Sequence, residues 1–142
     1  MSLPPRLQAI VADFELSAGK EKLDLLLEYA EKFQPLPERL KTDRSRMDPV
    51  PECMTPVSIY AQEVDGRLNL YFDIPPESPT IRGYAAILAE GLEGATAEEI
   101  LAVPGDFYLH MGLQQVLSFL RINGMAAILA HIKQMAVRTM AG

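Results

Sequence analysis

The sequence predicts an α+β fold, in which a small antiparallel β-sheet is covered by several α-helices. Residues 57–72 show the alternation of apolar and polar residues that is typical of two strands joined by a tight turn. Apolar residues at helical spacing occur both before and after this hairpin. Because an isolated hairpin is barely stable in water, the helices must cover its apolar face. We expect one domain over residues 1–142, since a chain of this length can bury a sizeable core.

Two helices are expected in the N-terminal third of the chain. Pro4 and Pro5 stand where the first turn of a helix tolerates proline, and Ser17 to Gly19 interrupts the segment that follows. A second helix is expected from Lys20 until Pro35 ends it. The apolar side of the first helix consists of Leu7, Ile10, Val11 and Phe14, and that of the second consists of Leu23, Leu26, Leu27, Ala30 and Phe33. We expect these two helices to pack as an antiparallel pair.

Residues 35–56 are expected to form a surface loop of limited flexibility. Prolines recur through this segment, and each removes a backbone donor and pushes its predecessor toward extended geometry. The segment is longer than the usual connection of about 4–6 residues, and long loops inside compact domains are often functional. Cys53 lies near its end.

The hairpin is predicted down to its register. Asp65 and Gly66 form a two-residue type I′ turn signal. Counting outward from that turn gives the cross-strand pairs Val64–Arg67, Ala61–Leu70, Tyr60–Tyr71 and Ile59–Phe72. This register makes one face apolar, as it must be when only one face is buried. A third strand beside the hairpin is left open.

Further helices are expected after the hairpin. One extends from about Thr80 to Glu90, and a capping box formed by Thr96 and Glu99 opens a short helix that ends near Leu101. A short helical piece is expected over residues 106–110. The last helix has Asn123 as its candidate N-cap. Its expected buried residues are Met125, Ile128, Leu129, Ile132 and Ala136.

The charge distribution indicates which classes of partner molecule the protein can bind. The net charge of −6 argues against non-specific nucleic-acid binding, which depends on neutralising phosphates with basic residues. Residues 60–110 carry nine acids against two bases, so this part is either a solvated acidic face or a docking surface for a partner protein. No signal peptide or apolar run of about 18 residues is present, so no membrane segment is expected. With its one unpaired cysteine, the chain is expected to be cytoplasmic.

Most familiar kinds of site are excluded. A single cysteine rules out an internal disulfide and any zinc or iron–sulfur site that needs several cysteines of one chain. No glycine-rich nucleotide-binding motif occurs, and His110 and His131 lack the spacing of metal ligands. Glu98 and Glu99 are more simply read as negative charge at a helix N-terminus. No metal and no cofactor are therefore expected.

Cys53 is either a buried, inert thiol or a reactive one. It lies in a proline-bounded loop, where burial on a helix or strand face is not expected, and reactive groups concentrate on such loops. Arg44 and Arg46 lie close in sequence and favour a thiolate, whereas the adjacent Glu52 opposes it.

Three stretches of the chain resemble one family. Residues 50–57, VPECMTPV, resemble the active-site loop of the SufE family of sulfur acceptors, which serve cysteine desulfurases. Residues 78–83, SPTIRG, resemble the segment that follows the hairpin in that family. Residues 113–124, LQQVLSFLRING, resemble its stretch before the last helix. The similarity covers about residues 3–137 and implies a fold similar to those of SufE and IscU.

The resemblance implies that Cys53 is the acceptor cysteine. Its thiolate would attack the outer sulfur of a desulfurase persulfide, and the protein would stimulate the desulfurase and carry the sulfur to iron–sulfur cluster assembly. The implied partners are a SufS-like, pyridoxal-phosphate-dependent desulfurase and a SufBCD-like scaffold complex. Arg121 matches an arginine near the site, and Arg82 lies in the second family-like segment. Both are expected to support the site or to contact the partner, as are Glu52, Met54 and Thr55. In place of the family's common Gly-Cys-Gln-Ser pattern, Glu52, Met54 and Thr55 surround the cysteine.

The residues leave three other functions open. One is an IscU-like iron–sulfur scaffold, although a cluster usually requires several thiolates. Another is a cysteine hydrolase, for which no histidine lies near Cys53 in sequence. The last is an interaction module with an inert thiol. The sulfur carrier itself is an enzyme only in the sense of a sulfurtransferase that acts as co-substrate and activator.

Overall fold

A computed structural model describes residues 3–141, which include an antiparallel sheet with the strand order β1–β2–β3–β4. The strands are β1 (Asp48–Pro49), β2 (Ser58–Val64), β3 (Arg67–Asp73) and β4 (Ala95–Thr96). The helices are α1 (Pro5–Leu16), α2 (Lys20–Glu31), α3 (Glu38–Thr42), α4 (Pro79–Gly91), α5 (Ala97–Leu101) and α6 (Phe119–Ala141), with short 3₁₀ turns at Arg44–Arg46, Phe107–Leu109 and Leu113–Gln115. The α+β class is confirmed.

The β2–β3 hairpin has the register that the sequence predicts. Val64 pairs with Arg67, and the pairing continues without a slip to Ser58 and Asp73. Asp65 and Gly66 have φ values of 54° and 79°, the left-handed conformation that a type I′ turn requires at both positions. The third strand left open by the sequence is in fact two strands, β1 and β4, of two residues each at the two edges.

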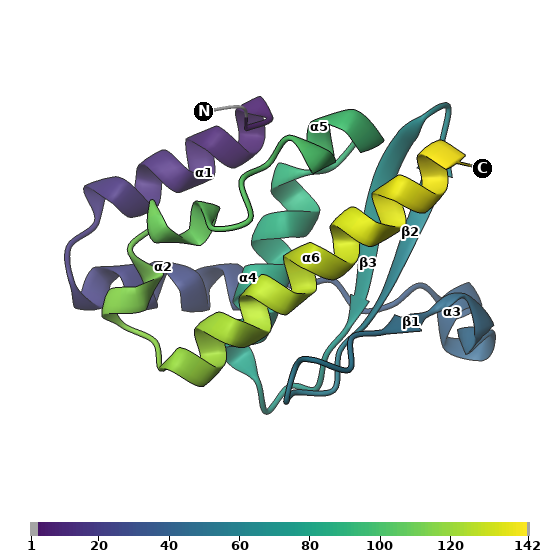
Figure 1. Ribbon diagram of the computed structural model, residues 1–142. Coiled ribbons are helices and arrows are strands. Elements are labelled where there is room, and N and C mark those ends of the chain that lie inside the picture. The colour runs from purple at the N-terminus through teal and green to yellow at the C-terminus, as the bar shows by residue number, and fades with distance from the viewer. Residues whose placement is uncertain (1–2, 142) are drawn as a thin grey trace.

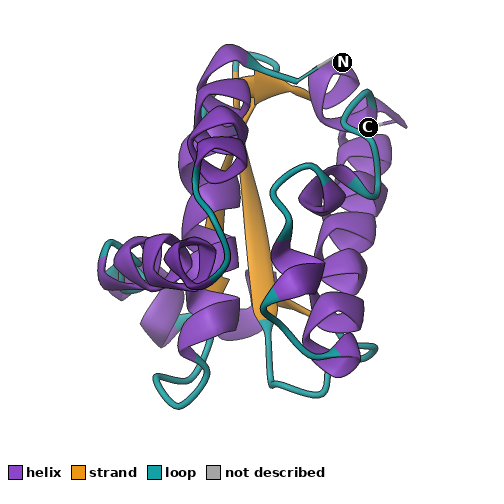
Figure 2. Cartoon of the chain, turned by 90° about the vertical axis from the view of Figure 1, so that its left-hand side faces the viewer, coloured by secondary structure: helices purple, strands orange, loops and turns teal. Residues whose placement is uncertain are grey.

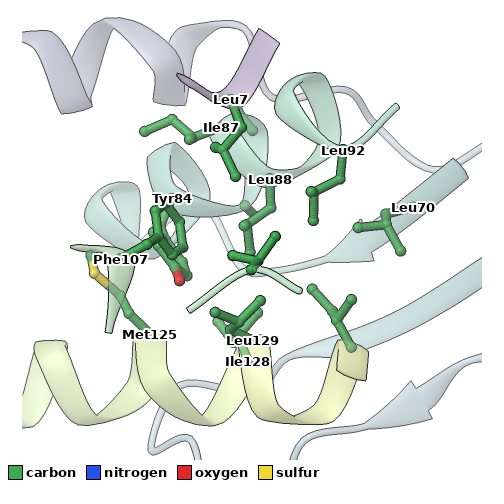
Figure 3. Packing of buried hydrophobic residues seen from close by; sticks show 14 of the residues in the cluster. Leu7, Leu70, Tyr84, Ile87, Leu88, Leu92, Phe107, Met125, Ile128 and Leu129 are labelled. Atoms are coloured by element: carbon green, nitrogen blue, oxygen red, sulfur yellow. The ribbon is translucent and has the colours of Figure 1, made fainter. Parts of the chain in front are cut away.

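The helices pack against one face of the sheet and beside its β3 edge, and the strand residues on the other face stay half-exposed. The long helix α6 crosses in front of the hairpin and α4 stands beside β3 in the view of Figure 1, and Figure 2 shows the same helices and strands from the side. Helix α4 contributes buried residues along most of its length, including Tyr84 and Leu88. These point toward Met125 and Leu129 of α6 in the core (Figure 3).

Helices α1 and α2 pack mainly on α4, so the expected antiparallel pair is a subsidiary contact. Direct contacts between them include the stacked rings of Phe14 and Tyr29, whose centroids are 6.2 Å apart. The buried ammonium of Lys22 also donates to the Phe14 carbonyl oxygen at 2.5 Å. That carbonyl lies near the end of α1 and also accepts from the backbone N–H of the C-cap residue Ser17 at 3.1 Å, so Lys22 provides a second donor to it.

The prediction that residues 35–56 form an irregular loop is wrong in part. The segment contains α3, a 3₁₀ turn and the edge strand β1, which pairs with the β2 residues Ser58 and Ile59. Leu40, Met47 and Val50 are buried and attach the segment to the core. Widely spaced apolar residues of this kind give no periodic signal, which is why the sequence pattern missed them.

Helix α6 begins earlier than predicted. Asn123 lies inside the helix, so its expected role as N-cap is wrong. Ser118 takes that role, because its hydroxyl oxygen accepts from the Arg121 backbone N–H at 3.3 Å and its carbonyl accepts from Ile122 at 3.1 Å. The five α6 residues that were expected to be buried are all buried, and the capping box of Thr96 and Glu99 is present.

Within residues 3–141, no helix combines the length and the apolar character that a membrane crossing requires.

Gly83 provides a test of the packing of α2 against α4. A Cβ at Gly83 would overlap the Leu26 backbone carbonyl oxygen and lie 3.1 Å from Leu26 Cδ1, and a helix backbone cannot easily move away. We therefore expect Gly83→Ala to lower the free energy of unfolding by about 1–3 kcal/mol. The control is Gly105→Ala, which would meet no atom within 4 Å. Urea unfolding of both variants measures the difference, and equal midpoints would contradict the close approach.

Candidate functional site

The Cys53 thiol is enclosed by the loop that carries it and by α6. It lies between β1 and β2, in a turn where its backbone N–H donates to the Val50 carbonyl at 3.2 Å. The loop is closed by a second bond, from Val50 N–H to the Val57 carbonyl at 2.9 Å. These bonds direct the side chain inward, and only 8% of Cys53 is exposed. The expectation that this loop position avoids burial is therefore wrong.

Gly124 is what makes room for the sulfur. A Cβ built on Gly124 would lie 3.1 Å from Cys53 Sγ and 3.7 Å from Ile81 Cδ1 of α4. The thiol therefore packs against a part of α6 that has no side chain, close to the first turns of α4. The segment 113–124 held the signal for this contact, but its glycine had no assigned role.

Burial dominates the electrostatics of the thiol. Removal from water raises the pKa of Cys53, while the backbone N–H of Thr55 and the positive charge of Arg121 act in the opposite direction. Arg44 and Arg46, which were expected to favour the thiolate, contact other residues instead. Arg44 forms an ion pair with Asp73 at 2.5 Å, and Arg46 donates to the Tyr60 hydroxyl at 3.4 Å. In this closed arrangement the neutral thiol is favoured.

Arg121 links the first turns of α6 and α4. Its guanidinium donates to the Thr80 hydroxyl at 3.0 Å, while the side chain stays exposed. Beside this link, the hydroxyls of Thr55 and Ser78 share a hydrogen bond of 3.3 Å. The three stretches that carry the family resemblance thus converge around the thiol. Ser78 and Thr80 lie in one of those stretches, but nothing in the pattern assigned them to the site.

Arg82 does not join this group. Its Nε donates to the Ile74 carbonyl at 2.9 Å, and its guanidinium lies 4.5 Å from the centroid of the Phe33 ring. These contacts place it at the end of β3 and next to the chain that follows α2. Among the described residues, no hydrogen bond or ion pair connects it with the thiol loop.

Large apolar side chains are exposed on both segments that flank the thiol. Met54, next to the cysteine, is 80% exposed, and Phe119 and Leu120, just before Arg121, are 76% and 60% exposed. Glu52 is also exposed. Exposed apolar side chains of this size near one site are typical of protein–protein contacts. The two residues of α6 were not singled out by the sequence analysis.

A metal site is not apparent. Residues 3–141 contain no cluster of three or more histidine, cysteine, aspartate or glutamate side chains that could hold an ion. No hydrogen bond in this range joins Cys53 to either histidine. The groups that the structure places together at the site are one thiol, the hydroxyls of Thr55, Ser78 and Thr80, and the Arg121 guanidinium.

Comparisons with known proteins converge on one family. Residues 8–136 match the family described as "SufE: Fe-S metabolism associated domain". An uncharacterised SufE-like protein of Mycobacterium tuberculosis is 47% identical over 134 residues, which make up 94% of this chain and 92% of that protein. SufE-like protein 1 of Arabidopsis thaliana is 35% identical over 136 residues, or 95% of this chain and 36% of the plant protein.

A solved structure agrees. The solution structure of a hypothetical protein from Thermus thermophilus superimposes with a TM-score of 0.85 at 33% sequence identity, covering 99% of both chains. The resemblance read from the three motifs is confirmed. The chain belongs to the SufE family, which is associated with iron–sulfur metabolism.

Proposed function

We propose that this protein accepts sulfur from a cysteine desulfurase on Cys53 and carries it toward iron–sulfur cluster assembly. The observation that supports this most is the convergence of the three family-like segments on the chain's single thiol, with Arg121 supplying a nearby positive charge. In the transfer step, the Cys53 thiolate attacks the outer sulfur of the desulfurase persulfide. A new S–S bond forms on Cys53, the old S–S bond breaks, and the desulfurase cysteine leaves as a thiolate.

With the loop of residues 50–57 closed, Cys53 is better placed to protect a bound sulfur than to attack the desulfurase persulfide. The nucleophile must be a thiolate, yet burial raises the pKa of Cys53 and favours the neutral thiol. Movement of residues 50–57 away from α6 would return the sulfur to water and remove the penalty of burial, which is the larger influence on its pKa, although it would also weaken the field of Arg121 on α6. The thiolate would therefore form when a partner draws the loop out. Reclosure would then shelter the carried sulfur against Gly124.

The surroundings of the thiol support a protein partner. Met54, Phe119 and Leu120 offer apolar contact area to a pyridoxal-phosphate-dependent desulfurase of the SufS type. Removal of its persulfide sulfur regenerates the partner's free thiol, which explains stimulation of its turnover. A second exchange of the same kind would pass the sulfur to a SufBCD-like scaffold. A reducing compartment such as the cytoplasm suits a carrier with a free thiol.

The departures from the common loop pattern have different consequences. Thr55 keeps the hydroxyl that a serine would provide, and it uses that hydroxyl to contact Ser78. Glu52 adds an exposed negative charge immediately before the cysteine, and Met54 replaces an amide with an apolar side chain. We infer that the partner surface facing this loop is apolar, with a basic group near Glu52.

The first prediction concerns the carried sulfur. After incubation with a SufS-type desulfurase and cysteine, peptide mass spectrometry should show one added sulfur atom on Cys53, which reductant removes. Cys53→Ser should show none and should no longer stimulate the desulfurase. An unmodified Cys53 during desulfurase turnover would exclude the carrier function, and iron bound to the purified protein would instead favour a scaffold.

The second prediction concerns Arg121. Because its charge lowers the pKa of the buried thiol, Arg121→Gln should raise that pKa further, so the pH profile of iodoacetamide alkylation should move to higher pH. Near neutral pH the reaction should be several-fold slower. Arg121→Lys should restore much of the rate. Arg138→Gln, on the same helix but paired with Asp48, should leave the profile unchanged. Identical profiles for the two glutamine variants would contradict this role.

The third prediction concerns Gly124. A methyl group at this position would press on Cys53 Sγ and displace the thiol outward. At a pH high enough to ionise the thiol fully, Gly124→Ala should therefore be alkylated several-fold faster than the natural protein. Gly105→Ala is the matched control. Circular dichroism verifies that both variants are folded, and an unchanged alkylation rate in Gly124→Ala would show that Gly124 does not enclose the thiol.

A further inference from the structure

On the edge of β3 that faces away from β2, the backbone groups are hydrogen-bonded at both ends of the strand but not in its middle. Leu68 presents its carbonyl to this edge, where it accepts from Gly94 N–H at 3.0 Å. Backbone groups of an antiparallel strand face the same edge at every second residue, so Leu70, Phe72 and Ile74 face it too. At the far end of the edge, the Ile74 carbonyl accepts a hydrogen bond from Arg82 Nε at 2.9 Å.

The two residues between these ends have no partner on that edge. Strand β4 pairs only with Arg67 and Leu68. Within residues 3–141, no hydrogen bond reaches the outward backbone groups of Leu70 or Phe72. Buried backbone groups are seldom left without a partner, because each one costs free energy comparable to a lost hydrogen bond.

A groove of about 490 Å³ lies directly along this open edge. One wall is α4, through Ala86 and Ala89, and the other is the chain that leaves α2, through Phe33 and Leu36. Figure 1 shows α4 standing beside β3. The Phe33 ring lies under the guanidinium of Arg82, so the residue that closes the edge also closes the end of the groove.

We propose that this groove binds an extended segment of a partner protein, which adds a short strand to β3 at Leu70 and Phe72. An extended peptide backbone presents donors and acceptors at the spacing of a β-strand, so it can pair with the unpartnered backbone groups of this edge. The edge is recessed, since Leu70 and Phe72 are only 7% and 4% exposed. Pairing of two copies of this chain through their β3 edges is excluded, because both edges are equally recessed and cannot meet.

The charges at the rim define the segment further. Glu90 and Glu93 lie along the α4 wall, and Glu93 is already paired with Arg6 at 2.5 Å. Lys32 lines the groove where the chain leaves α2, and its ammonium lies over the Tyr29 ring, 4.7 Å from the centroid. Glu90 forms no ion pair with any described residue. The segment therefore carries small apolar side chains toward Ala86 and Ala89 and a lysine or arginine toward Glu90. This surface is separate from the thiol loop, so the inference does not depend on the sulfur-carrier function.

The test uses a phage-displayed library of random heptapeptides that is selected for binding to the full-length protein. Peptides that also bind the Ala89→Phe variant, in which the larger side chain fills the groove, are removed by counter-selection. Ala130→Phe, at an exposed position on α6, is the matched control. We expect enriched peptides to alternate apolar residues with lysine or arginine, and to bind the control variant as they bind the natural protein. Thermal unfolding verifies that both variants are folded.

The strongest enriched peptide is then synthesised twice, once unmodified and once with methyl groups on the backbone nitrogens that would donate to β3. We expect the unmodified peptide to shift the amide resonances of Leu70 and Phe72 and to slow their hydrogen exchange. N-methylation should weaken binding about tenfold or more, because it removes the peptide N–H groups that donate to β3. Glu90→Lys should also weaken it. The proposal is overturned by enrichment no greater than on Ala89→Phe, by binding that leaves these two amides unchanged, or by equal binding of the N-methylated peptide.

Discussion

The close packing around α4 is the constraint on which the other features of this molecule depend. Two glycines let neighbouring helices approach its backbone, since a Cβ at Gly83 would overlap α2 and one at Gly91 would lie 3.0 Å from the Leu7 Cα of α1. The first turns of α4 bring Ser78, Thr80 and Ile81 to the thiol. Its last turns line the groove beside β3. One buried helix therefore sets the geometry of two distant surfaces.

The thiol shows the conflict between protection and reactivity in a simple form. The same enclosure that excludes water from Cys53 also disfavours its ionised form, and Arg121 offsets this only in part. A group that must be both sheltered and nucleophilic cannot achieve both in one conformation. In the proposed function, the protein would therefore alternate between a closed state that keeps sulfur and an open state that exchanges it.

The parts of the structure that depend on local signals could be predicted from the sequence. The hairpin register follows from the Asp65–Gly66 turn and from period-two alternation, and the capping box at Thr96 follows from its spacing. The strands β1 and β4 were missed because two residues carry no periodicity. The start of α6 was misplaced because both Ser118 and Asn123 suit an N-cap, and only the packing decides between them.

The sequence named candidate residues for the site but not the geometry that the structure gives them. Cys53 and Arg121 were both identified, and the structure brings them into electrostatic contact. The burial of the thiol could not be foreseen, because it depends on Gly124 and Ile81, which approach Cys53 only in the folded chain. Arg82 was assigned to the same neighbourhood by its motif, yet contacts with Ile74 and Phe33 hold it at β3.

The solitary, enclosed thiol has a consequence for timing. A persulfide is discharged when another thiol attacks it, and this chain offers no second cysteine to do so. In the proposed function, a protein that carries a persulfide therefore cannot release the sulfur by an intramolecular reaction. The sulfur stays on Cys53 until a second protein binds, so the rate of release depends on encounters with that acceptor.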